Sequence, residues 1–294
     1  MMRAHRICLA CCTMAVACLP ASPASSGLSW PPSPDRHAEV PSGEIPSARD
    51  TTGKVRVAPL ASRPGGRTYG SWAAAWTRWA VRTPAAAHPL LDATRDCGTG
   101  QTGGVWFLGG RLTPEGAPVE RRCTVPSGTA LFFLLAHEFW ISTPRLPCVA
   151  GDPWYGAGPA DRRHWALFQR GILDRIRPPR STNRLSLRIN GQPAGDLSGN
   201  FVRSPVFSAR LPADNILDAI EACGADDIPG FLATPSVTWG HYVYLEPLPP
   251  GRHTLRWQAN VKGGVFAPSL RQDVTYRITV ALGPTSPAAR TMAD

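Results

Sequence analysis

The chain has 294 residues, 43% of them hydrophobic, and a formal net charge of +10. This length and apolar content allow one domain with a sizeable core. The charge comes almost entirely from arginines spread along the chain, since Lys54 and Lys262 are the only lysines. A nucleic-acid-binding protein would show basic residues clustered with aromatic residues, so the composition argues against a nucleic-acid partner.

The first residues have the pattern of a secretory signal. Arg3 and Arg6 precede an apolar run over residues 7–19, and small residues follow at 20–24. The run is shorter than the roughly 20 apolar residues that span a bilayer, and we expect no transmembrane segment. We predict that residues 1–24 are a signal peptide and that the protein is secreted or held in the periplasm or cell envelope. The alternative is lipid anchoring at Cys18, because residues 15–18 loosely match an acylation site.

Four cysteines remain beyond the predicted signal: Cys97, Cys123, Cys148 and Cys223. An even number of cysteines in an exported chain predicts two disulfides. We favour pairing Cys97 with Cys123 and Cys148 with Cys223, because both loops then stay compact and unthreaded. The wide spacing lacks the paired ligands of a structural zinc site, so we predict neither a metal site nor a cofactor.

Residues 25–68 are rich in Pro, Ser, Gly and Ala, which predicts a disordered linker. A helix is then expected from about Ser71, which can cap its first turn, to Arg82, because Pro84 prevents its continuation. We expect a single folded domain over residues 69–283 and a flexible tail over residues 284–294.

Apolar runs and alternation define the expected elements that follow. Residues 105–108 predict a short buried strand, and residues 129–139 predict a strand covered on both faces. Helical spacing of apolar residues over 161–177 predicts a second amphipathic helix. Residues 185–189 alternate with period two and end at Asn190-Gly191, a favoured hairpin turn.

Strands are expected to dominate the last third of the chain. Residues 201–211, 237–245, 253–261 and 274–282 each fit a strand, and a short helical turn is expected within 214–223. Pro249-Pro250-Gly251 is expected to join two strands into a hairpin. Seven or eight strands at this spacing predict a mainly β fold, an antiparallel β-sandwich of jelly-roll or Ig-like type with two or three accessory helices.

Three stretches form a pattern that extends over most of the expected domain. They are Tyr69-Gly70-Ser71-Trp72, Cys123-Thr124-Val125-Pro126-Ser127-Gly128 and Pro247-Leu248-Pro249-Pro250-Gly251-Arg252-His253-Thr254. Together they resemble a group of exported bacterial proteins of unknown function. The motifs are turns and element boundaries, so the resemblance implies a shared fold without a particular chemistry.

Aromatic residues supply the candidate ligand contacts. Trp72, Trp76 and Trp79 share one helical face, and this spacing favours a core position over an exposed surface that stacks on sugars. Trp140 follows an apolar strand, and Trp154 and Tyr155 fall in a Gly/Pro-rich loop, where binding residues often collect. The alternative for these three is that they cover an edge of the core.

His137 and Glu138 interrupt an apolar strand and are the candidate catalytic residues. Adjacent strand residues face opposite sides, so one of the two should point inward and need a polar partner. A buried Glu138 in a cleft would have a raised pKa and could act as a general acid, with Asp92 as a second carboxylate for glycoside hydrolysis. The alternative is a structural ion pair with an arginine.

We therefore expect an exported, disulfide-stabilised, non-catalytic module that binds a cell-envelope polymer, a glycan or another extracellular ligand through loops at one end of the sandwich. The alternative is a secreted hydrolase that uses Glu138 with His137 or Asp92. No nucleophile elbow, zinc-protease motif or phosphate-binding loop is present in the sequence.

Overall fold

The computed structural model describes residues 55–92, 96–110, 117–141, 168–179, 181–219, 230–262 and 269–281. These residues form a mainly β fold with two five-stranded sheets, which confirms the predicted class. The predicted signal peptide, most of the predicted linker and the predicted tail lie outside the described residues.

The first sheet has the strand order β1-β3-β8-β6, and β7 also pairs with β8. Its strands are β1 (Val105–Leu108), β3 (Ala130–Ile141), β6 (Phe201–Arg203), β7 (Phe207–Arg210) and β8 (Leu232–Leu245). The single strand predicted over 201–211 was wrong. Pro205 separates β6 from β7, because proline has no N–H to donate to a strand ladder.

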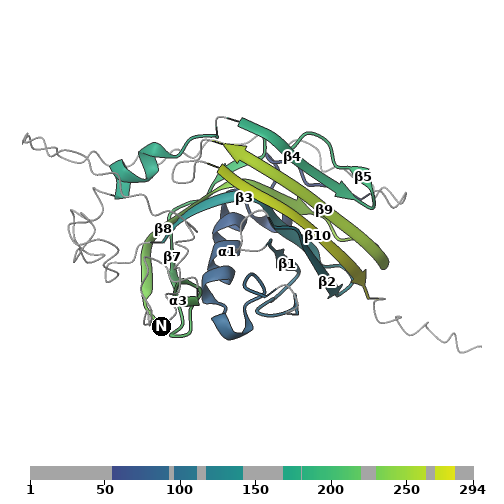
Figure 1. The fold of residues 1–294 in the computed structure, drawn as a ribbon, viewed down its shortest axis with the longest axis horizontal. Coiled ribbons are helices and arrows are strands. Elements are labelled where there is room, and N and C mark those ends of the chain that lie inside the picture. The colour runs from purple at the N-terminus through teal and green to yellow at the C-terminus, as the bar shows by residue number, and fades with distance from the viewer. Residues whose placement is uncertain are drawn as a thin grey trace, which may run out of the picture. The chain divides into compact units, whose positions relative to one another are not determined.

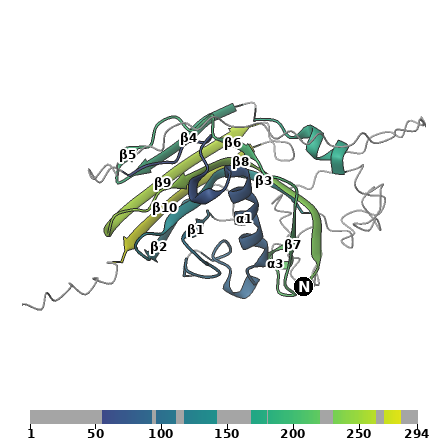
Figure 2. The ribbon, with the colours of Figure 1, turned by 180° about the vertical axis from the view of Figure 1, so that it is seen from behind.

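The second sheet has the order β2-β10-β9-β4-β5 (Figure 2). Its strands are β2 (Val119–Val125), β4 (Ser181–Ile189), β5 (Gln192–Pro193), β9 (Gly251–Lys262) and β10 (Ser269–Val280). In this sheet β2 runs parallel to β10, and in the first sheet β1 runs parallel to β3. Both sheets are therefore mixed, and the prediction of an antiparallel fold was wrong. Parallel pairs are joined by long crossovers, which local periodicity does not reveal.

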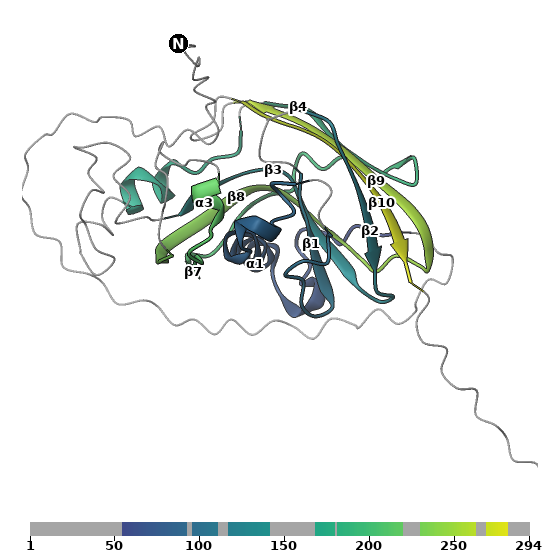
Figure 3. The same ribbon diagram turned by 60° about the horizontal axis from the view of Figure 1, so that its bottom comes forward.

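Helix α1 (Tyr69–Arg82) and the second sheet cover opposite faces of the first sheet (Figures 1 and 3). Neighbouring residues of β3 show both contacts. Phe132 packs with Trp72 on the α1 side, whereas Phe133 stacks on Trp257 of β9, with ring centroids 5.0 Å apart. The prediction that this strand is covered on both faces is confirmed.

Helix α1 begins earlier than predicted. Thr68 is its N-cap and accepts a hydrogen bond from the Ser71 backbone N–H at 3.2 Å, so Ser71 lies within the first turn and does not cap it. The helix ends at Arg82, two residues before Pro84, as predicted. All three tryptophans of the helix are buried, which confirms their core position.

Residues 55–68, which we assigned to the linker, pack on the folded part of the chain. Val57 forms a β-bridge with Leu245, and the Ala58 N–H donates to Tyr244 O at 2.9 Å. This segment also contains the short 3-10 helix η1 (Pro64–Gly66). The boundary at residue 68 was wrong because the surrounding prolines obscured a short apolar alternation at residues 55 and 57.

The other described helices are short. They are η2 (Ala85–Ala87), η3 (Leu173–Arg175), α3 (Ile216–Ala219) and a helical stretch over 168–171. Phe168, Ile172 and Ile176 are buried against Val237 and Trp239 of β8, as the apolar spacing predicted. The single helix predicted over 161–177 was wrong for its described part, because the chain leaves the helix at Ile172 and continues as η3. None of the helices in the described ranges has the length and apolar character to span a membrane.

Two predicted turns have different outcomes. Asn190 and Gly191 both adopt positive φ, at 52° and 79°, and join β4 to β5 as the predicted hairpin. The turn at residues 249–251 joins β8 to β9, but these strands belong to different sheets. The hairpin predicted there was wrong, because a turn motif does not specify which strands pair.

Candidate functional site

His137 and Glu138 lie on β3 with their side chains on opposite faces of the first sheet. The His137 ring packs on the α1 side, edge-on to Trp76 with centroids 5.1 Å apart and stacked with Phe139 at 5.6 Å. On the other face, Trp239 Nε1 donates a hydrogen bond to Glu138 Oε2 at 2.9 Å. The structure therefore separates the two side chains that were considered as a catalytic pair.

The environment of His137 is aromatic. Its Nε2 is buried and has no hydrogen-bond partner among the described residues. Burial lowers the pKa of His137 to about 4, because the charged imidazolium would lose its hydration. The ring is therefore neutral at pH 7 and packs as part of the core beneath α1.

The third candidate, Asp92, lies beside the second sheet. Its carbonyl oxygen accepts a hydrogen bond from Arg121 Nη1 at 3.2 Å, and Arg121 Nη2 donates to Gly110 O at 2.7 Å. Arg121 is buried on β2. These contacts tie Asp92 to β2, whereas the Glu138 carboxylate contacts β8.

The aromatic ligand candidates do not form a described site. Trp140 is half-buried and packs against the cluster of Phe168, Ile172 and Val237, so it covers an edge of the core. Trp154 and Tyr155 lie outside the described residues, as do Cys148 and Cys223. The predicted Cys97–Cys123 disulfide is formed, with a Cα–Cα distance of 5.7 Å.

An open groove of about 730 Å³ runs over the outer face of the second sheet. Outward-facing residues of β2, β9 and β10 line it: Arg122, Thr124, Arg252, Thr254, Arg277 and Thr279. In each strand the intervening residue is buried, because successive side chains alternate between the two faces. Alternation thus brings three guanidinium groups and three hydroxyl groups together from distant parts of the sequence.

Strand β1 and the segment before it complete the groove. Asp96, Gly98 and the half-buried Trp106 contribute to its lining. The Cys97–Cys123 disulfide connects this segment to β2. The disulfide therefore holds the Asp96 carboxylate beside the arginines, and the pairing of β1 with β3 positions the Trp106 indole.

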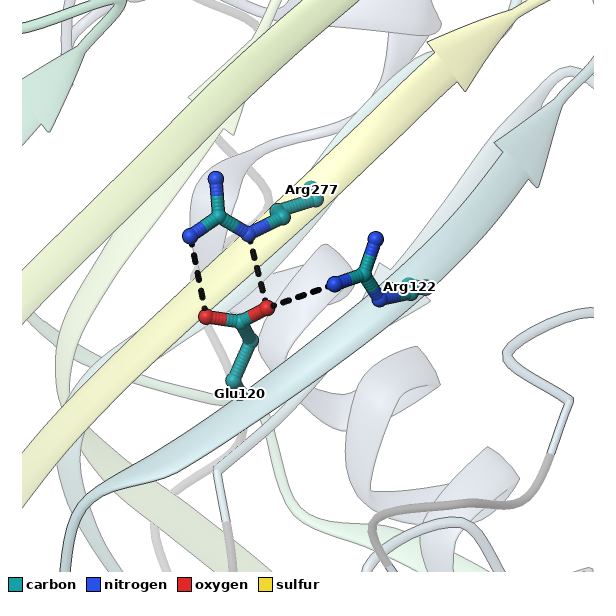
Figure 4. Close-up of polar contacts among 3 residues, drawn as sticks. All are labelled: Glu120, Arg122 and Arg277. Atoms are coloured by element: carbon teal, nitrogen blue, oxygen red, sulfur yellow. Dashed lines mark hydrogen bonds and ion pairs between the residues drawn. The ribbon is translucent and has the colours of Figure 1, made fainter.

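Glu120 of β2 lies beside the groove and binds two of its arginines (Figure 4). Arg277 Nε and Nη2 donate to its two carboxylate oxygens at 2.7 and 3.1 Å, and Arg122 Nη2 lies 3.3 Å from Oε1. The hydrogen bonds from Arg277 lower the pKa of Glu120. The side chains of Arg122 and Arg277 remain 80% and 53% exposed, so both guanidinium groups stay open to solvent.

The amino-acid sequence alone did not predict this groove. Its three arginines lie at positions 122, 252 and 277, and no stretch of the chain shows them as a cluster. A usable signal was the alternation within the predicted strands 253–261 and 274–282, which places Arg277 at an outward position and, extended by one residue, Arg252 also. Strand β2 itself was not predicted, since the inward Arg121 interrupts its apolar alternation.

No protein-family model matches this chain, and a search of the curated proteins found no match. The described residues contain no group of three or more His, Cys, Asp or Glu side chains that could hold a metal ion.

Proposed function

We propose that the protein is an exported, non-catalytic module that binds a cell-envelope or extracellular ligand in the groove on the outer face of the second sheet. The observation that supports this proposal most is the convergence of Arg122, Arg252 and Arg277 with Trp106 in one open groove. Binding sites combine a concave surface with a few convergent polar groups. The signal pattern at the N-terminus and the Cys97–Cys123 disulfide support export, because disulfides persist in oxidising compartments.

A β-sandwich architecture is part of the same proposal. Side chains from both sheets, including Phe133, Trp257 and Tyr276, share one apolar cluster, as the two layers of a sandwich would. The parallel pairs β1–β3 and β2–β10 give no support to the jelly-roll or Ig-like type, whose sheets are antiparallel.

The hydrolase alternative has less support from the geometry. The cavity beside Glu138, which Arg177 and His241 also line, has a volume of only about 20 Å³. A single water molecule needs at least about 10 to 15 Å³ of such space, so the cavity has no room for a sugar ring. His137, its proposed partner, also borders this cavity, but its imidazole ring packs against Trp76 on the opposite face of the sheet.

Co-sedimentation with bacterial cell-envelope fragments tests the proposal. The protein, secreted from its own leader, is mixed with the fragments, and both the pellet and the sugars released into the supernatant are measured. We expect retention in the pellet without sugar release above the protein-free control. An unretained protein would contradict the binding function. Sugar release that disappears in Glu138→Gln would instead establish the hydrolase.

A further inference from the structure

We infer that the ligand of the groove is an acidic polysaccharide, whose carboxylate or sulfate groups contact Arg122, Arg277 and Arg252. This inference rests on the proposed function and names the class of ligand. Three observations support it: the register of β2, β10 and β9, the hydrogen-bonding capacity of the guanidinium groups, and the hydroxyl, indole and carboxylate groups that lie near the arginines.

The three arginines form a row across the sheet. Arg122 of β2 is the direct neighbour of Arg277 of β10, and Arg252 of β9 is paired with Thr279, two residues further along β10. Adjacent strands are about 4.8 Å apart, and diagonal neighbours are about 7 to 8 Å apart. An extended chain with repeated acidic groups can therefore contact the three side chains in succession.

Most of the guanidinium N–H groups in this row are available to a ligand. A guanidinium has five N–H donors, of which Glu120 accepts two from Arg277 and one from Arg122. No carboxylate of the described residues lies within ion-pair distance of Arg252. Bidentate hydrogen bonds to carboxylates and sulfates match this planar donor geometry.

The same face carries further positive charge. Arg184, Arg188 and Arg256 are exposed at outward positions of β4 and β9, and Asp273 pairs with Arg256 at 3.5 Å. Their combined field raises the local concentration of an anionic polymer near the groove. The attraction should weaken as salt is added, because exposed charges are screened over about 8 to 10 Å.

The other groups in the groove favour a glycan over a nucleic acid. The Thr124, Thr254 and Thr279 hydroxyls can exchange hydrogen bonds with sugar hydroxyls, and the indole of Trp106 offers an apolar surface to a pyranose ring. Asp96 in the groove and Glu120 beside it can accept hydrogen bonds from sugar hydroxyls. Both carboxylates repel anionic groups of any ligand, and this repulsion is strongest for duplex DNA, which carries one negative charge per about 1.7 Å of its axis.

Binding of the secreted protein to three polymers tests the inference: polygalacturonate, neutral dextran and a short DNA duplex. The groove variant combines Arg122→Gln, Arg252→Gln and Arg277→Gln. The control variant combines Arg63→Gln, Arg203→Gln and Arg210→Gln, which removes three exposed charges outside the groove. We expect the groove variant to bind polygalacturonate about tenfold more weakly or worse, whereas the control changes little.

Two single variants keep the test valid if the triple groove variant does not fold. Arg252→Gln replaces an exposed guanidinium by a neutral amide without breaking a described ion pair, and it should weaken polygalacturonate binding. Glu120→Gln should strengthen it, because the variant removes a negative charge and releases guanidinium donors. The inference would be overturned if the groove and control variants lost the same amount of polygalacturonate affinity. It would also be overturned if Arg252→Gln bound polygalacturonate as tightly as the wild type.

The remaining outcomes separate this inference from the proposed function. The protein could be retained on envelope fragments without binding polygalacturonate, or it could bind dextran as tightly as polygalacturonate. Either result would overturn the inference of an acidic ligand but would leave the proposed binding function standing. Tighter binding of the DNA duplex would also overturn it, in favour of a nucleic-acid ligand. Failure to bind both envelope fragments and polygalacturonate would remove the proposed function itself.

Discussion

Arg277 of β10 forms a two-point contact with Glu120 of β2, with Nε–Oε1 and Nη2–Oε2 distances of 2.7 and 3.1 Å. Arg277 is also the direct strand neighbour of Arg122, which contacts the same carboxylate. Like charges placed directly opposite each other destabilise a sheet. Glu120 offsets this repulsion and holds two arginines of the groove in place.

We expect Glu120→Gln to lower the melting temperature, and to lower it more at low salt than at high salt. The variant leaves Arg122 and Arg277 adjacent without a compensating charge, and salt screens their repulsion. The folded-state pKa of Glu120 is lowered, so its stabilising effect is present above the usual carboxylate pKa and is lost on acidification through the lowered value. Thermal unfolding at low and high salt tests the expected salt dependence, with Glu246→Gln as the control. A decrease in melting temperature that is the same at both salt concentrations would contradict the prediction.

Trp76 should be essential to the packing of α1 on the first sheet. Its indole is buried, donates from Nε1 to Leu108 O at 2.8 Å and contacts Trp79 and His137. We expect Trp76→Ala to lower the free energy of unfolding by about 3 to 5 kcal/mol, measured by urea denaturation. Trp140→Ala, at a half-buried position, should cost less. A Trp76→Ala variant as stable as the wild type would show that α1 does not form part of the core.

The sequence predicted well the elements whose signal is local. Alternation located β9 and β10, a continuous apolar run located β3, and Pro84 marked the end of α1. It did not predict the parallel pairs β1–β3 and β2–β10, because these depend on residues that are distant in the chain. The interpretation of the Pro249-Pro250-Gly251 turn failed for the same reason.

The candidate site was predicted less well than the fold. Adjacent strand residues were expected to face opposite sides, and His137 and Glu138 do so, which separates the proposed catalytic pair. The groove depends on β2, where the buried Arg121 takes an inward position that alternation would assign to an apolar residue. Its carbonyl partners at Asp92 and Gly110 offset the cost of burying it, but they are visible only in the structure.

The Cys97–Cys123 disulfide should contribute substantially to stability. The two cysteines are 26 residues apart, and chain entropy predicts a stabilisation of up to about 3.5 kcal/mol for a loop of this length. We expect the double variant Cys97→Ala/Cys123→Ala to unfold at lower urea concentration. Because the bond connects the Asp96 and Trp106 side of the groove to β2, polygalacturonate binding should also weaken. Free thiols at both positions in protein purified under oxidising conditions, detected by mass spectrometry, would contradict this prediction.

His137 should make the fold sensitive to acid. The unfolded chain binds a proton at this residue near pH 6.5, whereas burial lowers the folded-state pKa to about 4. Between these values the unfolded state binds more protons, so stability falls as the pH decreases from about 6.5 to 4. One pKa unit corresponds to about 1.4 kcal/mol, so the loss should be on the order of 2 to 3 kcal/mol.

The variant His137→Phe separates this effect from general acid denaturation. The aromatic contacts with Trp76, Phe139 and Tyr242 can be kept, while the titrating nitrogen is removed. Burial also lowers the pKa values of His88 and His241, so the variant should retain a weaker pH dependence of the same sign. We expect urea denaturation between pH 7 and 4.5 to show a smaller loss of stability in His137→Phe than in the wild type. Parallel curves for the two proteins would mean that His137 is accessible to protons in the folded state.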